Sequence, residues 1–322
     1  MKPIGGYFEW EFPRTRNTDL HKGSVYLNSG RHAFEYILRG LGNIQRLWVP
    51  YFTCNTALQP LDTLKVPYKF YNINDKLELK NEIELGENEY LLYTNYYGIK
   101  DSYCKNIAEK YSQKIIIDNA QALFCAPSLH AHQFYSPRKY IGVPDGGIAV
   151  TELPDTTNSL QEYASYNRCS HLLKRVELPP SEGYIDFQTN DNNIGNAKLS
   201  RISPISKHIF ESVDFDFVKN KRRKNFNYLH KVLAPSNQLN IPSMDSFACP
   251  LVYPYLCKNG KDLKKHLIEH SIFVATYWPN VLEWTKQNDL EYELANNVVC
   301  IPIDQRYGIK EMDTIIQFIQ QL

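Results

Sequence analysis

"KIIIDNAQAL" (Lys114–Leu123) is the stretch that decides the fold. Its consecutive isoleucines form a short β-branched run, which is typical of a strand buried on both faces of a parallel sheet. The run stops at Asp118, so we expect the strand to end there on an acid. An aspartate at such a position is more often a turn or cap residue than a ligand group. Gln121, three residues further on, adds a second polar side chain at the same strand end. Ligands of parallel sheets bind beyond the carboxyl ends of the strands, so we consider a ligand-binding site here.

The segments before this strand alternate between extended and helical patterns. Strands are predicted at residues 25–27, 46–50, 68–73 and 90–97, and helices at 31–42, 53–61 and 101–111, the last with Asp101 as its N-cap. Strands that alternate with helices predict an α/β fold with a mostly parallel sheet covered by helices on both faces.

The pattern changes after about residue 153. A long helix is predicted near residues 217–232, followed by a helix at 262–270, strands at 272–276 and 298–303, and a final helix from Lys310. We therefore expect a large α/β domain over residues 1–200 and a small α+β domain over residues 201–322. The boundary between them is expected somewhere in 155–205.

A second segment, "FYSPRKYIGVPDGGIAV" (Phe134–Val150), places Lys139 between two extended runs and ahead of a glycine pair. A loop lysine usually just faces solvent. A buried or half-buried lysine with a lowered pKa, in contrast, is the standard amine for a Schiff base. Gly146 and Gly147 favour this second interpretation, because glycines let the backbone approach a ligand closely or turn tightly before a strand.

The turn at Ser29 and Gly30 lies between a predicted strand and the start of a predicted helix. A hydroxyl, a glycine and helix N-terminal amides can hold a phosphate, although the same pair is also an ordinary cap. A carboxylate, a lysine and a phosphate cradle at one sheet edge are together what pyridoxal 5'-phosphate requires. The carboxylate would keep the pyridine nitrogen protonated, and the lysine would hold the aldehyde and move the substrate proton.

With these residues in this order, the sequence resembles a known family, the DegT/StrS-type sugar aminotransferases, which are fold type I pyridoxal phosphate enzymes. IIIDNAQAL is similar to the family's IED-AQALG, and KYIGVPDGGIAVT keeps the family's spacing from lysine to glycine pair. The resemblance covers nearly the whole chain in order, and its weaker motifs are LNSGRHAFEYILRGLG, LWVPYFTCNTALQPL, GNAKLS and VVCIPIDQRYGIKEMDTIIQFI. It implies a large domain with a mostly parallel sheet and a smaller α+β C-terminal domain.

The resemblance also implies a role for each matching residue. Lys139 would be the catalytic Schiff-base lysine, Asp118 would pair with the pyridine nitrogen, and Gln121 would lie beside the ring near its phenolic oxygen. Ser29 and Gly30 would bind the phosphate.

Asn196 would reach across a subunit interface to the partner's phosphate, so the resemblance implies a homodimer with two shared sites.

The chain departs from the family pattern at several positions. Arg31 stands where a small threonine is usual, and its guanidinium could still donate to phosphate. Phe134 occupies the place of a serine that precedes the lysine, and Ser136 could substitute for that serine. Cys54 stands where an aromatic residue is common, so ring stacking falls to Tyr51 or Phe52, or is absent.

The activity implied is that of a transaminase that moves an amino group, with glutamate as the expected donor, to a nucleotide-linked keto-sugar in saccharide biosynthesis. Two alternatives stay open. One is a non-catalytic or regulatory protein on the same scaffold, which the departures at Arg31 and Phe134 motivate. The other is a pyridoxal phosphate enzyme with different chemistry, such as racemisation or elimination.

Composition excludes several other classes. The formal net charge of +1 gives no electrostatic basis for binding nucleic acid or an anionic membrane, and the basic run at 219–224 fits a solvated helix face. Seven cysteines without CxxC spacing argue against a disulfide framework and a zinc site, so no metal is expected. The chain shows no signal peptide and no apolar run of membrane-spanning length, so a cytoplasmic location with reduced thiols is expected.

Overall fold

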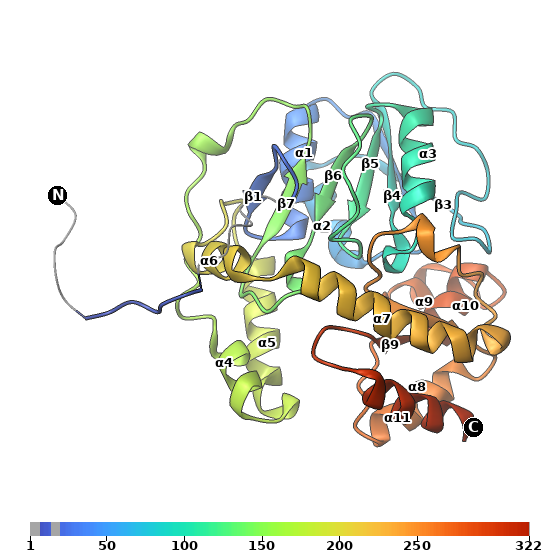
Figure 1. The fold of residues 1–322 in the computed structure, drawn as a ribbon. Helices are drawn as coiled ribbons and strands as arrows, with labels where there is room; N and C mark the ends of the chain where they lie inside the picture. The colour runs from blue at the N-terminus through green and yellow to red at the C-terminus, as the bar shows by residue number, and fades with distance from the viewer. Residues whose placement is uncertain (1–6, 14–19, 322) are drawn as a thin grey trace.

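The protein is described by a computed structural model that covers residues 7–13 and 20–321. Its larger sheet has seven strands in the order β1-β7-β6-β5-β4-β2-β3 (Figure 1). These strands are β1 Val25–Leu27, β2 Arg46–Pro50, β3 Tyr68–Tyr71, β4 Glu89–Thr94, β5 Ile115–Asn119, β6 His132–Tyr135 and β7 Gly147–Val150. The pairs β2–β3, β2–β4, β4–β5 and β5–β6 are parallel, whereas β7 runs antiparallel to both β6 and β1. The predicted mostly parallel sheet is confirmed.

Helices cover both faces of this sheet. On β5, the buried side chains of Ile115 and Ile117 belong to one core cluster and that of Ile116 belongs to a second cluster, which includes the apolar side of α1 (Gly30–Leu41). The first cluster packs the sheet against α3 (Asp101–Tyr111) and α7 (Phe215–Leu233). Alternate residues of a strand point to opposite faces, so an apolar run such as this isoleucine triplet fits a sheet covered on both sides.

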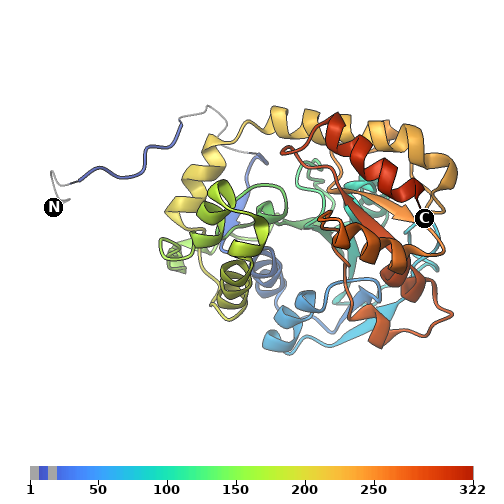
Figure 2. The same ribbon diagram turned by 90° about the horizontal axis from the view of Figure 1, so that it is seen from below.

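The chain after β7 adds helices and a small second sheet. A hairpin of α4 (Ser170–Glu177) and α5 (Pro180–Gly195) extends away from the large sheet (Figure 1). Strands β8 (Val252–Leu256) and β9 (Val298–Pro302) pair antiparallel, and α11 (Ile309–Gln320) lies beside α7 in both views (Figures 1 and 2). The remaining helices are α2 Gln59–Leu64, α6 Pro204–Ser212, α8 Gly260–Glu269, α9 Val281–Trp284 and α10 Leu290–Asn297. No helix in the described ranges is long and apolar enough to cross a membrane.

Three local predictions are wrong. Residues 272–276 do not form a strand; Ala275 alone makes a bridge to Cys300, on the edge of β9 that β8 leaves open. Asp101 is not the N-cap of α3. Lys100 takes that position, and the Asp101 carboxylate accepts hydrogen bonds from the side chain of Asn95 (2.7 Å) and the amide of Ala248 (2.8 Å).

The third correction concerns the basic run at 219–224, which is not a uniformly solvated face. Arg222 is 2 % exposed, and Arg223 donates to the carbonyls of Phe247 (2.7 Å) and Ala248 (2.9 Å). Lys224 is exposed, as predicted.

Candidate functional site

Asp118 lies at the carboxyl edge of the sheet, where it pairs in register with Thr94 on β4 and Phe134 on β6. Its side chain is buried, and Oδ1 accepts a hydrogen bond from the amide of Ala120 at 2.8 Å. Burial raises the pKa of Asp118, and the positive charge of Lys139 acts in the opposite direction. The structure therefore brings Asp118 and Lys139 to the same edge of the sheet, and a cationic partner would stabilise the buried carboxylate.

Lys139 ends a short 3-10 turn, Pro137–Lys139, directly after β6. Its side chain is exposed, so the expectation of a buried or half-buried amine is wrong for this chain. The turn carries the residue past the end of the sheet. Among the described residues, no carboxylate lies within ion-pair distance of the amine.

Gln121 has a buried donor without a partner. Its side chain is 1 % exposed, and Oε1 accepts a hydrogen bond from the amide of Tyr97 at 2.7 Å. The Nε2 group is buried and has no hydrogen-bond partner in the described part of the chain. Most buried polar groups are satisfied, so an orphaned amide close to Asp118 indicates a ligand acceptor that remains to be supplied.

The glycine pair packs against the start of α1. Gly146 adopts a φ of +135°, and its amide donates to the carbonyl of Asn28 at 2.9 Å. A Cβ added to Gly147 would overlap the carbonyl of Ser29 and would lie 2.6 Å from the amide nitrogen of Gly30. The glycines therefore allow close approach of backbone to backbone, and they fix the turn that precedes α1.

Ser29 is the N-cap of α1, as its sequence position predicts, and it forms a pair with His32 that the sequence reasoning missed. The Ser29 hydroxyl oxygen accepts from the amide of His32 (3.2 Å) and lies 2.7 Å from its Nδ1, while Nε2 of His32 lies 3.0 Å from the carbonyl oxygen of Ala197. Burial lowers the pKa of His32, which favours the neutral ring with its proton on Nε2. The hydroxyl of Ser29 then donates to Nδ1 of His32, which leaves anion binding at this turn to backbone amides such as that of Arg31.

Ser136 and Gly30 lie together, as the predicted cradle requires. A Cβ on Gly30 would be 3.2 Å from the Cβ of Ser136, whose hydroxyl has no hydrogen bond among the described residues. Phe134 points elsewhere: it is 4 % exposed and stacks on Phe34 with ring centroids 5.0 Å apart. A serine at position 134 would face that core, so Ser136 is the residue placed to act in its stead.

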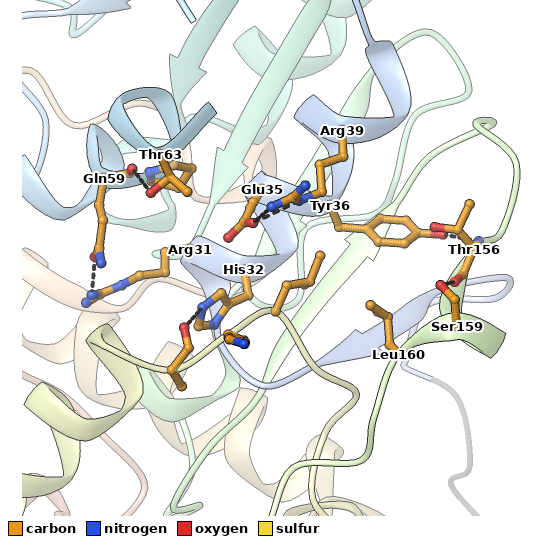
Figure 3. Close-up of a pocket in the computed structure, with 14 residues that line it drawn as sticks. Arg31, His32, Glu35, Tyr36, Arg39, Gln59, Thr63, Thr156, Ser159 and Leu160 are labelled. Carbon is orange, nitrogen blue, oxygen red and sulfur yellow. Dashed lines mark hydrogen bonds and ion pairs between the residues drawn. The ribbon is translucent and has the colours of Figure 1, made fainter. Parts of the chain in front are cut away.

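Arg31 lines a cavity of about 570 Å³ on the outer side of α1 (Figure 3). Its Nη1 donates to Oε1 of Gln59 at 2.5 Å, and Nε2 of Gln59 donates to the carbonyl of Gly195 at 2.6 Å. Burial lowers the pKa of the guanidinium. The side chain thus links α1 to the end of α5 and is already engaged, whereas the sequence predicted a phosphate donor.

Asn196 caps the C-terminus of α5 and is exposed. The residues on either side of it contact the first turn of α1, because the Gly195 backbone lies against the Arg31 guanidinium and the Ala197 carbonyl lies next to His32. The Asn196 side chain makes no hydrogen bond within the described ranges.

The expected stacking aromatics are occupied by other contacts. Tyr51 stacks on Phe70 (4.7 Å), and Phe52 packs edge-on against Trp278 (4.6 Å). Both rings are therefore held by neighbours, and the half-buried Cys54 is left at the position where the family has an aromatic residue.

No protein-family model and no curated protein matches this chain. Solved structures match it over most of its length. The DegT DnrJ EryC1 StrS aminotransferase from Brucella abortus is 15% identical with a TM-score of 0.61, over 92% of this chain and 85% of that one. DesI, solved in the presence of its TDP-sugar product, is 13% identical with a TM-score of 0.64, over 94% and 80%. NtdA from Bacillus subtilis with bound PMP is 14% identical with a TM-score of 0.63, over 92% and 73%. The chain therefore has the fold of these aminotransferases, and the expected fold type I architecture is confirmed.

Proposed function

We propose that this protein is a pyridoxal 5'-phosphate-dependent aminotransferase. The observation that carries the proposal is the set of groups at one sheet edge: the buried carboxyl of Asp118, the exposed amine of Lys139 and the orphaned amide of Gln121. The donor set fits the cofactor, because each group has a complementary atom on it. The similarity in fold to solved aminotransferases supports the proposal.

The residues of the chain would share the work of binding. Asp118 would pair with the pyridine nitrogen, which offsets the cost of its burial. Gln121 Nε2 would donate to the phenolic oxygen. The α1 N-terminus at Ser29 and Gly30, together with the Ser136 hydroxyl, would hold the phosphate through amides and a hydroxyl.

When bound, pyridoxal 5'-phosphate supplies an aldehyde that exchanges amines and a ring that accepts electrons. Lys139 would provide the amine that holds the cofactor covalently. The same Nζ would take a proton from the substrate carbon and return it, as a general base and acid.

The proposed substrates are a nucleotide-linked keto-sugar and an amino donor, for which glutamate is the first candidate. The proposed role is in saccharide biosynthesis in the cytoplasm. The TDP-sugar product named for DesI supports this choice. We further propose a division into a cofactor domain over residues 1–200 and a small domain over 201–322. In the proposed homodimer, Asn196 would contact the partner's phosphate.

The test is nitrogen transfer. The purified protein with pyridoxal 5'-phosphate is incubated with ¹⁵N-glutamate and a panel of nucleoside-diphosphate keto-sugars, and the products are analysed by mass spectrometry. We expect ¹⁵N in one amino-sugar nucleotide, loss of transfer in Lys139→Ala, and normal transfer in Lys105→Ala, a control at an exposed lysine on α3. Cofactor uptake without transfer to any sugar would favour racemisation or elimination. A protein that takes up no cofactor would favour the non-catalytic scaffold, for which the engaged Arg31 and the core position of Phe134 are the supporting observations.

A further inference from the structure

A closed circuit of hydrogen bonds joins the loops at the sheet edge to the C-terminal part of the chain. It runs through Gln121, Tyr140, Arg222, Leu251 and Tyr97, and we call these five residues the interdomain ring. Tyr140 directly follows Lys139, and Gln121 is the residue with the orphaned amide. The circuit therefore contains one proposed cofactor residue and the covalent neighbour of another.

On the sheet side, the ring fixes Gln121 from two directions. The Tyr140 hydroxyl donates to the Gln121 carbonyl at 2.7 Å, and the Tyr97 amide donates to Oε1 of the same residue at 2.7 Å. Burial raises the pKa of Tyr140 well above its usual value, so the hydroxyl stays protonated and remains a donor. Gly98, with a φ of +71°, leaves room for this contact, because a Cβ there would lie 3.1 Å from the Tyr140 hydroxyl and would overlap the Gln121 carbonyl.

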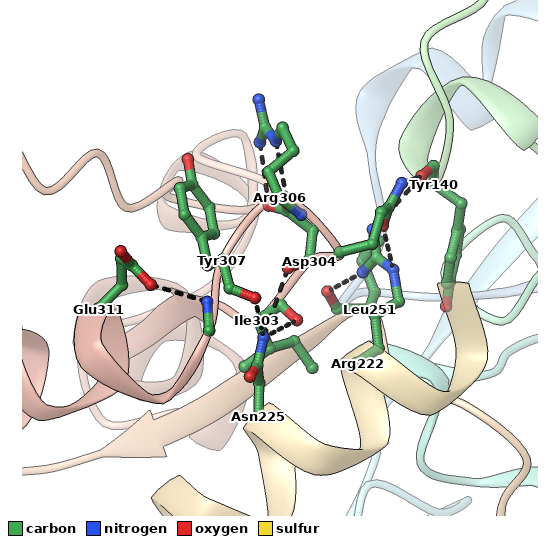
Figure 4. A network of polar contacts seen from close by, with 11 residues as sticks. Tyr140, Arg222, Asn225, Leu251, Ile303, Asp304, Arg306, Tyr307 and Glu311 are labelled. Carbon is green, nitrogen blue, oxygen red and sulfur yellow. Dashed lines mark hydrogen bonds and ion pairs between the residues drawn. The ribbon is translucent and has the colours of Figure 1, made fainter. Parts of the chain in front are cut away.

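On the C-terminal side, Arg222 closes the ring (Figure 4). Its guanidinium donates to the Leu251 carbonyl at 2.8 Å and, at 3.5 Å, to the Tyr140 carbonyl, and it stacks 4.5 Å from the centre of the Tyr140 ring. The Leu251 amide donates to the Tyr97 carbonyl at 2.8 Å, which completes the circuit. Gln305 reinforces it, since its Nε2 donates to the Tyr140 carbonyl at 2.8 Å and its Oε1 accepts from Arg222 Nε at 3.1 Å.

We propose that Arg222 is a positioning residue, which holds Tyr140 so that the Lys139 turn and Gln121 keep a fixed separation. The inference rests on the proposed function for its catalytic meaning. Lys139 is the exposed last residue of a three-residue turn in which Pro137 is buried and Arg138 is ion-paired with Asp191, and no side-chain contact holds the lysine itself among the described residues. Productive geometry tolerates displacements of only about 0.5 Å, so an amine on such a turn needs rigid support. The ring supplies it at both ends of Tyr140, its carbonyl and its hydroxyl.

The burial of Arg222 agrees with this role. Burying a guanidinium, here 2 % exposed, destabilises the fold unless its N–H groups make hydrogen bonds. Those of Arg222 donate to the Gln305 side chain and to the carbonyls of Tyr140 and Leu251. Arg223, the next residue, is the matched control. It donates to the carbonyls of Met244, Phe247 and Ala248, and it contacts no member of the ring by a hydrogen bond.

The first test uses the protein without added cofactor and measures amide hydrogen exchange by mass spectrometry in the wild type, Arg222→Met and Arg223→Met. The reporters are the amides of Tyr140 and Ile141, which bond to Pro137, and that of Ala122, which bonds to Asn119. We expect at least about fivefold faster exchange in peptides covering residues 119–125 and 137–143 for Arg222→Met, and wild-type rates there for Arg223→Met. Equal effects of the two variants, or no effect of either, would overturn the proposal. Gln305→Leu, at a half-buried position, removes the shorter of the two hydrogen bonds to the Tyr140 carbonyl, and exchange in the 137–143 peptide must accelerate in it as well.

The second test measures the dissociation constant of pyridoxal 5'-phosphate and the transfer kinetics. Arg222→Met is expected to weaken cofactor binding about tenfold and to lower kcat while the KM for the amino donor stays unchanged. Arg222→Lys, which keeps the positive charge but only one donor nitrogen, should recover part of both. A wild type that binds no cofactor would refute the proposed function, and the exchange experiment would still decide whether the ring holds the two loops.

Discussion

Gly147→Ala should damage the α1 cradle without changing any group that carries chemistry. The added Cβ would overlap the Ser29 carbonyl and lie 2.6 Å from the Gly30 amide nitrogen. An ordinary contact of this kind is 3.4–4 Å, so one of the two backbone segments must move by about 1 Å. Neither can move freely, because the Gly146 amide is bonded to the Asn28 carbonyl. We expect a loss of about 3 kcal/mol in the free energy of unfolding, at the upper end for an overpacked site.

The same displacement should weaken cofactor binding, since a misplacement of about 1 Å at a binding group costs up to about a hundredfold. Urea unfolding gives the stability, and fluorescence titration with pyridoxal 5'-phosphate gives the dissociation constant. Gly142→Ala is the matched control, because its Cβ would meet only a Leu172 methyl at 3.7 Å. It should stay within about 0.5 kcal/mol of the wild type. Wild-type unfolding and wild-type cofactor affinity in Gly147→Ala would refute the steric reasoning.

Three further changes test single residues of the site. Burial raises the pKa of Asp118 above its usual 3.8, so the ionised carboxylate opposes folding, and stability falls as pH rises through the raised pKa. Asp118→Asn should therefore stabilise the cofactor-free protein at neutral pH, by about 1.4 kcal/mol for each unit of that pKa shift, and the gain should vanish in acid. Urea unfolding from pH 3 to 8 measures this, and a gain in stability that persists at pH 3 would contradict it. Ser29→Ala should cost about 1 kcal/mol of unfolding free energy through loss of the N-cap, and an unchanged urea midpoint would argue against the cap. Phe134→Ser should cost about 3–5 kcal/mol by emptying the stack with Phe34 and should not improve cofactor binding; tighter binding would show that position 134 does face the site.

The elements that the sequence predicted well are those with a strong local pattern. The isoleucine run predicted β5 almost to its end, and the helical pattern of residues 31–42 predicted α1, whose C-cap is Gly42. The strand at 272–276 was predicted from a β-branched run alone. β8 occupies one edge of β9, and on the other edge Ala275 alone makes a bridge, so local composition was insufficient to predict whether 272–276 pairs as a strand.

The sequence predicted the part of the site that lies at strand ends and missed the part that depends on tertiary contacts. Residues at strand ends, such as Asp118, are placed by the topology of the sheet, so the sequence could bring them together. The backbone packing of Gly147 on Ser29 depends on a tertiary contact, which no local pattern encodes. Arg222 could have been found: it shares a helical face with Val218 and Phe226, both buried, and a charge on an apolar stripe indicates a buried polar contact.

The most direct test of the central claim is to find where the cofactor attaches. The protein is incubated with pyridoxal 5'-phosphate, reduced with borohydride and digested, and the labelled peptide is identified by mass spectrometry. The account predicts one phosphopyridoxyl group per chain, on Lys139, and no stable labelling in Lys139→Ala. Labelling at another lysine, or label spread over the exposed lysines with Lys139 unmodified, would contradict it.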